Sequence, residues 1–180
     1  MTTNQPQAGG DAPITNFSNC HVGIIKGMNA LGELPGLLEP AERARRIAES
    51  VVALFHDAVL EHHSEEEEAL FPAVLASAQP GEEAENVKRQ IERLTREHRE
   101  VEAMWKKLEP ALKKVAKGHD AQLDVAAVDK LVALYSAHAA YEEAEFLPLS
   151  EKILGRNANH MSALGLTLHM RHTDVMGTYI

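Results

Sequence analysis

The chain has 180 residues and a net charge of −9 at neutral pH. This length suits one domain with its own hydrophobic core. The acidic balance argues against a nucleic-acid partner, because phosphate binding requires a basic face. The single Cys20 cannot form an internal disulfide, and neither a basic-then-apolar leader nor an apolar run of bilayer length is visible. We therefore expect a cytoplasmic protein with no membrane partner.

The first half of the sequence predicts a tail and two helices. Residues 1–12 are polar and contain Gly and Pro, which predicts a flexible N-terminal tail. Apolar residues three and four apart predict a first helix over 14–31, which Gly32, Pro35, Gly36 and Pro40 should break. A second helix should start near Ala41, with an inward stripe that includes Leu54, His62, Glu66 and Ala69.

The second half predicts two more long helices and a short one. A turn at 79–83 (QPGEE) should precede a third helix with the stripe Leu94, His98, Val101 and Trp105. Pro110 is not expected to end that helix, whereas Gly118 is. A fourth helix should carry Leu131, His138 and Glu142 inward and end near Gly155. Residues 157–172 predict a short fifth helix.

These elements predict an all-α fold: an up-down-up-down four-helix bundle with a short extra C-terminal helix. The expected division is a tail over 1–12, the bundle over 13–155, and a C-terminal helix and tail over 156–180. The last segment should pack on the bundle or on a partner subunit, as in a homodimer. An internal repeat supports related helical hairpins, because HHSEEEEALFP at 62–72 aligns with HAAYEEAEFLP at 138–148.

Histidines and glutamates recur at helical spacing on the predicted inward stripes. Residues four apart share a helix face, which pairs His62 with Glu66, His98 with Glu102 and His138 with Glu142; His21 adds a lone imidazole. Unpaired buried carboxylates would lose much hydration free energy, and divalent cations would neutralise them. Four imidazoles with two or three carboxylates suit two first-row metals, and the carboxylates favour iron or manganese. The Glu-x-x-His pattern of ferritin-like di-iron proteins does not occur.

The ordered series of these motifs resembles the hemerythrin-like (HHE cation-binding) family over about residues 14–150. The residues that carry the resemblance are His21 in NCHVGII, His62 and Glu66 in the first repeat, His98 in REHREVE, and His138 and Glu142 in the second repeat. The resemblance implies a four-helix bundle that holds a non-heme di-iron centre. It also implies that Glu66 and Glu142 bridge two irons, one bound by His21 and His62 and the other by His98 and His138.

The sequence departs from the oxygen-carrying hemerythrins on the third helix. Where they have a second histidine four residues after the first, this chain has Glu102, and its spacing to the last carboxylate also differs. Glu102 is either a metal ligand, or a surface or supporting group. His63 is either a surface or supporting group, or a substitute ligand. The metal-ligand prediction therefore comprises His21, His62, Glu66, His98, Glu102, His138 and Glu142.

The resemblance implies a protein that binds or senses O2 or a related oxidant, such as peroxide or NO, at a pair of iron ions. Mn or Zn are substitutes that the same ligands would accept. The alternative is iron storage, delivery or repair of iron centres, with a protein partner that the sequence does not identify. A dedicated enzyme ranks below both, because no substrate-binding motif is visible. His160, His169 and His172 are either a second metal site or surface and packing residues.

Overall fold

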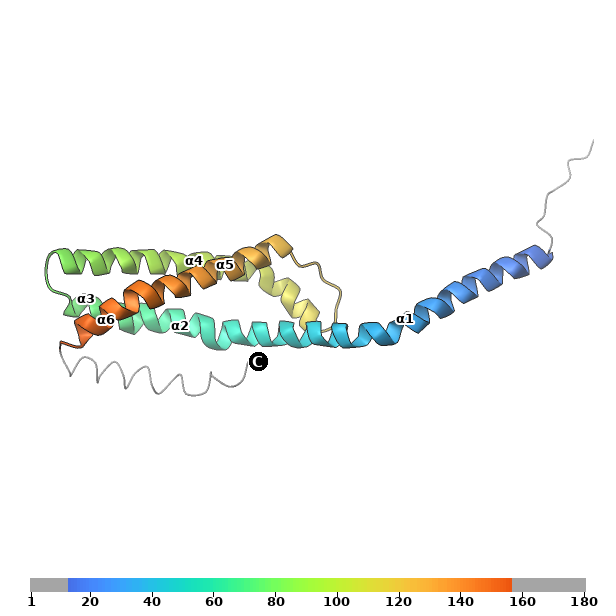
Figure 1. Ribbon diagram of the computed structural model, residues 1–180, viewed down its shortest axis with the longest axis horizontal. Coiled ribbons are helices and arrows are strands. Elements are labelled where there is room, and N and C mark those ends of the chain that lie inside the picture. Colours follow the sequence, from blue (N-terminus) through green and yellow to red (C-terminus); the bar gives the residue numbers. More distant parts are fainter. Residues whose placement is uncertain (1–12, 157–180) are drawn as a thin grey trace, which may run out of the picture. The chain divides into compact units, whose positions relative to one another are not determined.

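The computed structural model describes residues 13–156, with side chains from residue 21 onward. This part of the chain is helical and contains no strand (Figure 1), which confirms the all-α prediction. No helix in it is long and apolar enough to cross a membrane. The chain divides into two compact units, Met1–Arg43 and Ala44–Ile180. The predicted tail, the predicted C-terminal helix and His160, His169 and His172 lie outside the described residues.

The N-terminal unit contains the first part of helix α1, which extends from Pro13 to Leu54. The predicted break over Gly32–Pro40, with a new helix near Ala41, is therefore wrong: Pro35 and Pro40 both lie inside α1. Each proline removes one backbone donor and clashes with the carbonyl four residues before it, but the residues from 41 onward (AERARRIAES) are mostly strong helix formers, and the helix continues through both prolines. The number of glycines and prolines between residues 32 and 40 therefore led to an overestimate of how strongly they interrupt the helix.

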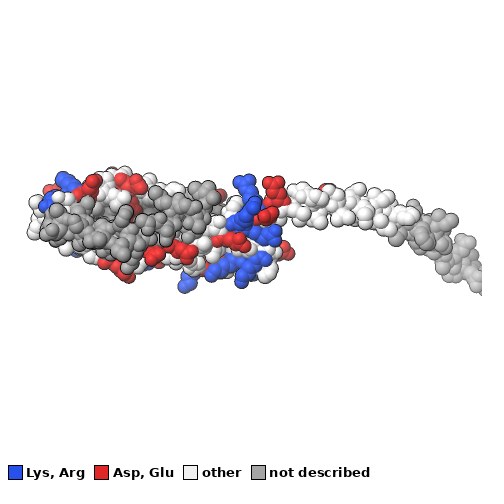
Figure 2. Space-filling view, turned by 90° about the horizontal axis from the view of Figure 1, so that it is seen from below, with Lys and Arg blue, Asp and Glu red and all other residues white. Residues whose placement is uncertain are grey.

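Within the N-terminal unit, the described side chains are exposed. Between residues 21 and 43 none is buried. Residues 21–38 contain only two charged side chains, Lys26 and Glu33, and Figure 2 shows this stretch as almost uncharged. Its large apolar side chains are exposed by about half or more: Val22, Ile24, Ile25, Met28, Leu31, Leu34, Leu37 and Leu38. This unit therefore has no hydrophobic core of its own in the part that is described.

Up to residue 156, where the described part ends, the second unit contains three helical rods (Figure 1). The first rod contains the end of α1, the π-helical turn η1 (Phe55–Val59), α2 (Leu60–Glu65), the π-helical turn η2 (Glu66–Leu70) and α3 (Phe71–Ser77). The second rod is α4 (Glu82–Ala116). The third rod contains α5 (Val125–Tyr141), the π-helical turn η3 (Glu142–Phe146) and α6 (Leu147–Leu154).

Glycines and an aspartate set several ends of the rods, and the glycine ends are those that the sequence predicted. Gly81 precedes α4 with φ of 101°, and Gly118 follows it with φ of 71°, a backbone region that glycine enters without steric cost. The Gly118 and His119 N–H groups donate to Val115 and Lys114 carbonyls and so close the helix end. Asp124 caps α5, because its side chain accepts a hydrogen bond from the Ala127 N–H. The turn at 79–83, the passage through Pro110 and the end near Gly155 are thus confirmed.

The three rods run up, down and up. Helix α4 packs along α5, and α3 packs against both α4 and α6, so the C-terminal ends of the first and third rods lie together. This order matches three helices of the predicted bundle. The fourth predicted helix, over 14–31, belongs to the N-terminal unit, and its place in a bundle stays a prediction.

The core of the second unit has two apolar clusters. One contains Leu70, Phe71, Val74, Val87, Leu94, Phe146, Ile153 and Leu154. The other contains Phe55, Val59, Val101, Trp105, Leu108 and Leu131. On every rod, the residues between these two sets include a buried histidine or glutamate. The hydrophobic core therefore encloses a polar layer, which is where the sequence placed its candidate ligands.

Candidate metal centre

The buried part of the polar layer includes three histidines and two glutamates whose side chains face one another. His63, His98 and His138 are at most 2% exposed, Glu66 is 3% exposed and Glu142 is 6% exposed. They come from all three rods: His63 and Glu66 from the first, His98 from α4, and His138 and Glu142 from the third. Such groups are costly to bury unless they are paired or bind a cation.

The three histidines form one candidate site. One ring nitrogen of each lies within 4.8 Å of one from the other two. The His63 and His98 rings stack with centroids 3.9 Å apart, and the His138 ring meets His98 edge-on at 4.9 Å. The Nε2 atoms of all three are buried without a hydrogen-bond partner. A neutral imidazole uses such a nitrogen as a metal ligand.

Each of these rings has its other nitrogen against a carboxylate. Nδ1 of His98 lies 2.8 Å from Glu67 Oε1, Nδ1 of His138 lies 3.2 Å from Glu97 Oε2, and Nδ1 of His63 lies 3.4 Å from Glu102 Oε1. A carboxylate accepts hydrogen bonds, so this arrangement assigns the proton to Nδ1 and the free lone pair to Nε2. Metal-binding histidines typically show this pattern.

Burial keeps two of the three rings neutral. It lowers the pKa of His63 to about 3, assisted by the neighbouring His98, and it lowers the pKa of His138. For His98, burial also acts to lower the pKa, but the contacts with Glu66 and Glu67 outweigh it and the pKa is raised. Neutral imidazole is the form that binds metals.

A second candidate site joins His62, Glu66 and Glu142, whose ligand atoms also lie within 4.8 Å of one another. His62 Nε2 is 3.5 Å from Glu66 Oε1 and 4.0 Å from Glu142 Oε2. The same carboxylates reach the three-histidine site: Glu66 Oε2 is 3.2 Å from His98 Nε2, and Glu142 Oε2 is 4.0 Å from His138 Nε2. Both carboxylates therefore lie between the two sites.

The two central carboxylates share one proton. Burial and the adjacent Glu66 raise the pKa of Glu142 to about 9. Burial acts to raise the pKa of Glu66 as well, but its contacts with His98 and Glu142 lower it to about 2. Two carboxylates this close cannot both ionise readily without a cation. Both Glu66 oxygens are buried without a hydrogen-bond partner, so this pair is suited to a positive charge between the sites.

Both central glutamates begin a π-helical turn. The Phe71 N–H donates to the Glu66 carbonyl and the Leu147 N–H to the Glu142 carbonyl, five residues back in each case. The residue after each turn's closing donor is a proline, Pro72 or Pro148. Proline has no N–H and clashes with the carbonyl four residues before it, and a π turn lets the helix continue past such a defect. The sequence repeat thus encodes the same local structure twice.

His63 is the ligand candidate that sequence reasoning underrated. Of the alternatives that the sequence left open for His63, a surface position is wrong, because His63 is 1% exposed whereas the His62 side chain is 38% exposed. A signal was present: six of the buried residues of the first rod follow one another at steps of three and four, namely Phe55, Val59, His63, Glu66, Leu70 and Val74. The predicted stripe assumed regular α-helical pitch, whereas the π turns at 55–59 and 66–70 shift its phase.

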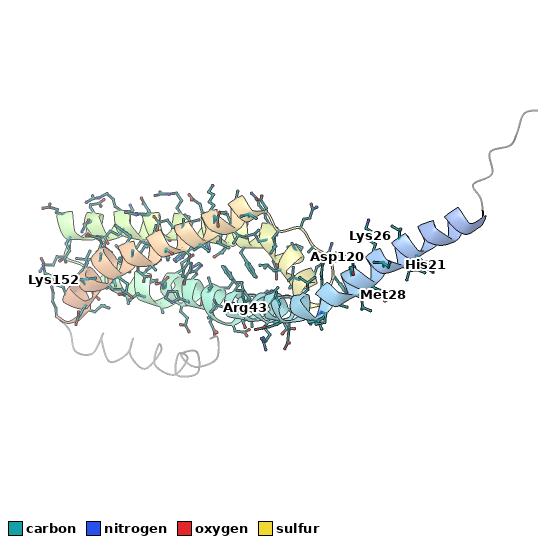
Figure 3. The ribbon with its side chains drawn as sticks, turned by 45° about the vertical axis from the view of Figure 1, so that its right-hand side comes forward. His21, Lys26, Met28, Arg43, Asp120 and Lys152 are labelled. Carbon is teal, nitrogen blue, oxygen red and sulfur yellow. The ribbon has the colours of Figure 1, made fainter. Side chains whose placement is uncertain are left out.

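Glu102 belongs to neither of these groups, and the place of His21 relative to them stays a prediction because it belongs to the other unit. Glu102 Oε1 contacts Nδ1 of His63 and Nη1 of Arg99, and its side chain is 30% exposed. His21 lies on α1 in the N-terminal unit with Lys26 and Met28, and all three are exposed (Figure 3). The remaining predicted ligands, His62, Glu66, His98, His138 and Glu142, are brought together.

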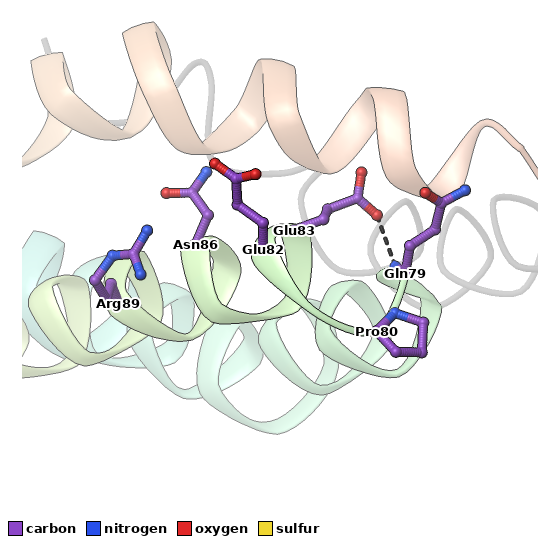
Figure 4. A pocket seen from close by; sticks show the side chains of 6 residues that line it. All are labelled: Gln79, Pro80, Glu82, Glu83, Asn86 and Arg89. Atoms are coloured by element: carbon purple, nitrogen blue, oxygen red, sulfur yellow. Dashed lines mark hydrogen bonds between the residues drawn. The ribbon is translucent and has the colours of Figure 1, made fainter.

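One hollow reaches the central carboxylates. It has a volume of about 400 Å³ and is lined by His62, Glu65, Glu66, Leu70, Tyr135, Ala139, Glu142, Glu143 and Leu147. A larger hollow of about 630 Å³ lies at the start of α4 (Figure 4) and is lined by Gln79, Pro80, Glu82, Glu83, Asn86 and Arg89. The second hollow has no histidine in its lining, so of these two hollows it is the first that joins a histidine and the central carboxylates to a space for a small molecule.

Comparison with known proteins agrees with this geometry. The profile of the hemerythrin HHE cation binding domain matches residues 12–150, and the chain belongs to this family. It is 26% identical over 158 residues to an uncharacterized protein of Haemophilus influenzae (strain ATCC 51907 / DSM 11121 / KW20 / Rd), a match that covers 84% of this chain and 88% of the relative. No solved structure matches significantly.

Proposed function

We propose that this chain is a di-iron protein that binds or senses O2 or a related oxidant such as peroxide or NO. The observation that carries the proposal is the set of buried ligand atoms without partners: Nε2 of His63, His98 and His138, and both oxygens of Glu66. A folded core loses stability when it keeps this many potential metal-ligand atoms buried without a hydrogen-bond partner. Cations bound at these atoms would remove that cost.

The ligands divide between two ions. His63, His98 and His138 would hold one ion and His62 would hold the other, while Glu66 and Glu142 face both sites. His63 takes the place that the sequence analysis gave to Glu102. His21 completes the second ion, as the resemblance to the family implies. Imidazole with carboxylate favours iron, and Mn or Zn are acceptable substitutes.

The chain's own residues provide access to a small oxidant. Ferrous ions, when bound, supply the electrons that reduce O2 or peroxide. The hollow beside His62 admits a small molecule, and Leu70, Ala139 and Leu147 give it apolar walls. Apolar walls limit the entry of water. The Tyr135 side chain lines the same hollow, and burial raises the pKa of its hydroxyl, so this group stays protonated.

Anaerobic purification with metal analysis tests the proposal. We expect two irons per chain, and a change in near-ultraviolet absorption when the ferrous protein meets oxygen. Glu66→Ala should lose one or both irons because it removes a carboxylate that faces both sites. Glu68→Ala is the matched control, since Glu68 is exposed and accepts a hydrogen bond from Ser64. Equal iron content in the native chain and both variants would contradict the proposal.

Iron storage or delivery is the second candidate function, and the exposure of His62 favours it. Its side chain is 38% exposed at the hollow, so an ion held there would exchange more easily than one held by the three buried histidines. Rapid loss of one iron of two to a mild chelator, without a spectral response to oxygen, would favour this function. Slow loss of both irons, with a spectral response, would favour oxidant binding.

A further inference from the structure

The carboxylates behind the three histidines are themselves held by arginines. Arg99 donates through Nη2 to Glu67 Oε2 and through Nη1 to Glu102 Oε1, the latter at 2.9 Å. Glu67 faces Nδ1 of His98, and Glu102 faces Nδ1 of His63. One guanidinium therefore connects to two of the three rings through two carboxylates.

We propose that Arg99 is a positioning residue for the three-histidine site. Its planar fork fixes Glu67 and Glu102. These carboxylates in turn fix the orientation and the Nδ1–H tautomer of His98 and His63, so that both Nε2 lone pairs point to one place. This inference rests on the proposed cation binding.

The third ring shows the same construction with a different arginine. Arg93 Nε lies 2.7 Å from Glu97 Oε1, and Glu97 Oε2 lies 3.2 Å from Nδ1 of His138. The Arg93 guanidinium also lies 3.4 Å above the centre of the Tyr141 ring, a cation–π contact that restrains it. All three rings thus have a carboxylate that an arginine holds, which argues against a chance surface ion pair at Arg99.

Exposure separates this role from a role in folding. The side chain of Arg99 is 56% exposed, that of Glu102 is 30% exposed and that of Glu67 is 22% exposed. Ion pairs this open to solvent contribute little to stability. A variant without the guanidinium should therefore fold, and its effect should appear in metal binding.

The direction in which removal of the Arg99 guanidinium changes metal affinity distinguishes a positioning role from simple charge repulsion. A cationic side chain near a metal site repels the incoming cation, so removing it should strengthen binding if charge were its only effect. If Arg99 orients the ligands, its removal should weaken binding instead. Loss of groups that orient metal ligands typically lowers affinity by about 10- to 100-fold.

The test is a titration of the metal-free full-length chain with Co2+ against a competing chelator. We expect Arg99→Ala to lower Co2+ affinity about 10-fold or more at an unchanged melting temperature of the metal-free protein. Arg96→Ala is the control, because Arg96 is exposed on the same helix and no ion pair joins it to Glu67 or Glu102. Unchanged or higher affinity in Arg99→Ala would overturn the proposal.

A second pair of variants tests the route through the carboxylates. In a Glu67→Gln/Glu102→Gln background, Arg99→Ala should produce no further loss, since its partners no longer carry charge. An equal loss in both backgrounds would overturn this route. Failure of the native chain itself to bind Co2+ would instead contradict the proposed cation binding, so the two failures are distinguishable.

Discussion

At the scale of single residues, the candidate metal centre consists of buried carboxylates and imidazoles that lack a cation to balance and bind them. Glu66 and Glu142 share a proton because their oxygens are buried and adjacent, and the Nε2 atoms of His63, His98 and His138 are buried without a hydrogen-bond partner. Each of these features lowers the stability of the metal-free fold and raises its affinity for a cation. The polar layer is thus a place where stability is given up for binding.

The protonation of Glu142 predicts how stability of the metal-free protein depends on pH. The pKa of Glu142 is about 9 in the folded chain and 4.5 when exposed. Its contribution to the free energy of unfolding is therefore fully present below about pH 4.5 and is lost as pH rises through 9. The raised pKa of His98 acts in the same direction. The His63 pKa of about 3 acts only below pH 6.5, so the window from pH 7 to 9 isolates the decrease.

We expect the free energy of unfolding to fall between pH 7 and 9 by up to about 1.4 kcal/mol per pH unit from this group. Glu142→Gln cannot lose a proton and should show a much weaker dependence. Urea denaturation of the native chain and of Glu142→Gln, both freed of metal with a chelator, at pH 7, 8 and 9 measures the difference. Identical slopes would show that Glu142 is not protonated in the folded chain.

At the scale of helices, the two repeats place their carboxylates by interrupting regular α-helix. Glu66 and Glu142 each begin a π turn, and a proline follows each turn. The wider turn changes which side of the rod the preceding residues face. The π turn η1, which precedes His63, shifts the first rod in the same way and explains why His63, and not His62, is the most buried histidine of its rod.

Replacing Pro148 by alanine tests this dependence. Alanine restores an N–H and removes the clash, so η3 should relax towards regular α-helix and rotate Glu142 relative to His138. We expect at least a several-fold loss of metal affinity with no loss of helicity by circular dichroism. Pro110→Ala is the control: Pro110 lies inside α4 away from any π turn, so that variant should gain stability and keep its metal affinity.

The sequence predicted the regular parts of this fold and missed the irregular ones. Spacing alone identified the α4 stripe of Leu94, His98, Val101 and Trp105, all of which are buried. It placed the end of α4 correctly because Gly118 has a direct conformational role. A π turn changes which residues of a helix face inward, but no single residue marks it in the way that Gly118 marks a helix end. It can be recognised only when the two repeats and their prolines are aligned, and for this reason His63 was underrated. Tertiary contacts place the His63 ring in the three-histidine group and Glu102 behind that ring. The spacing of residues along the sequence does not encode such contacts.

At the scale of the whole molecule, the metal-ligating residues of the second unit already form two groups without the N-terminal unit. Three imidazoles supply the first group, whereas His62 is the one imidazole of the second. An ion held by one imidazole and two shared carboxylates has fewer protein ligands than its neighbour. The resemblance of NCHVGII to the family motif implies that His21 is a further ligand, and this stays a prediction.

Substitution of His21 tests that assignment in the full-length chain. We expect His21→Ala to weaken binding of one metal ion of two by about 10-fold or more, because it removes a direct ligand of the site that has fewest. The other ion, held by His63, His98 and His138, should keep its affinity. Lys26→Ala is the matched control, since Lys26 is exposed on the same helix and in the same unit (Figure 3). Stepwise titration with Co2+ resolves the two binding events, and two unchanged affinities in His21→Ala would remove His21 from the ligand set.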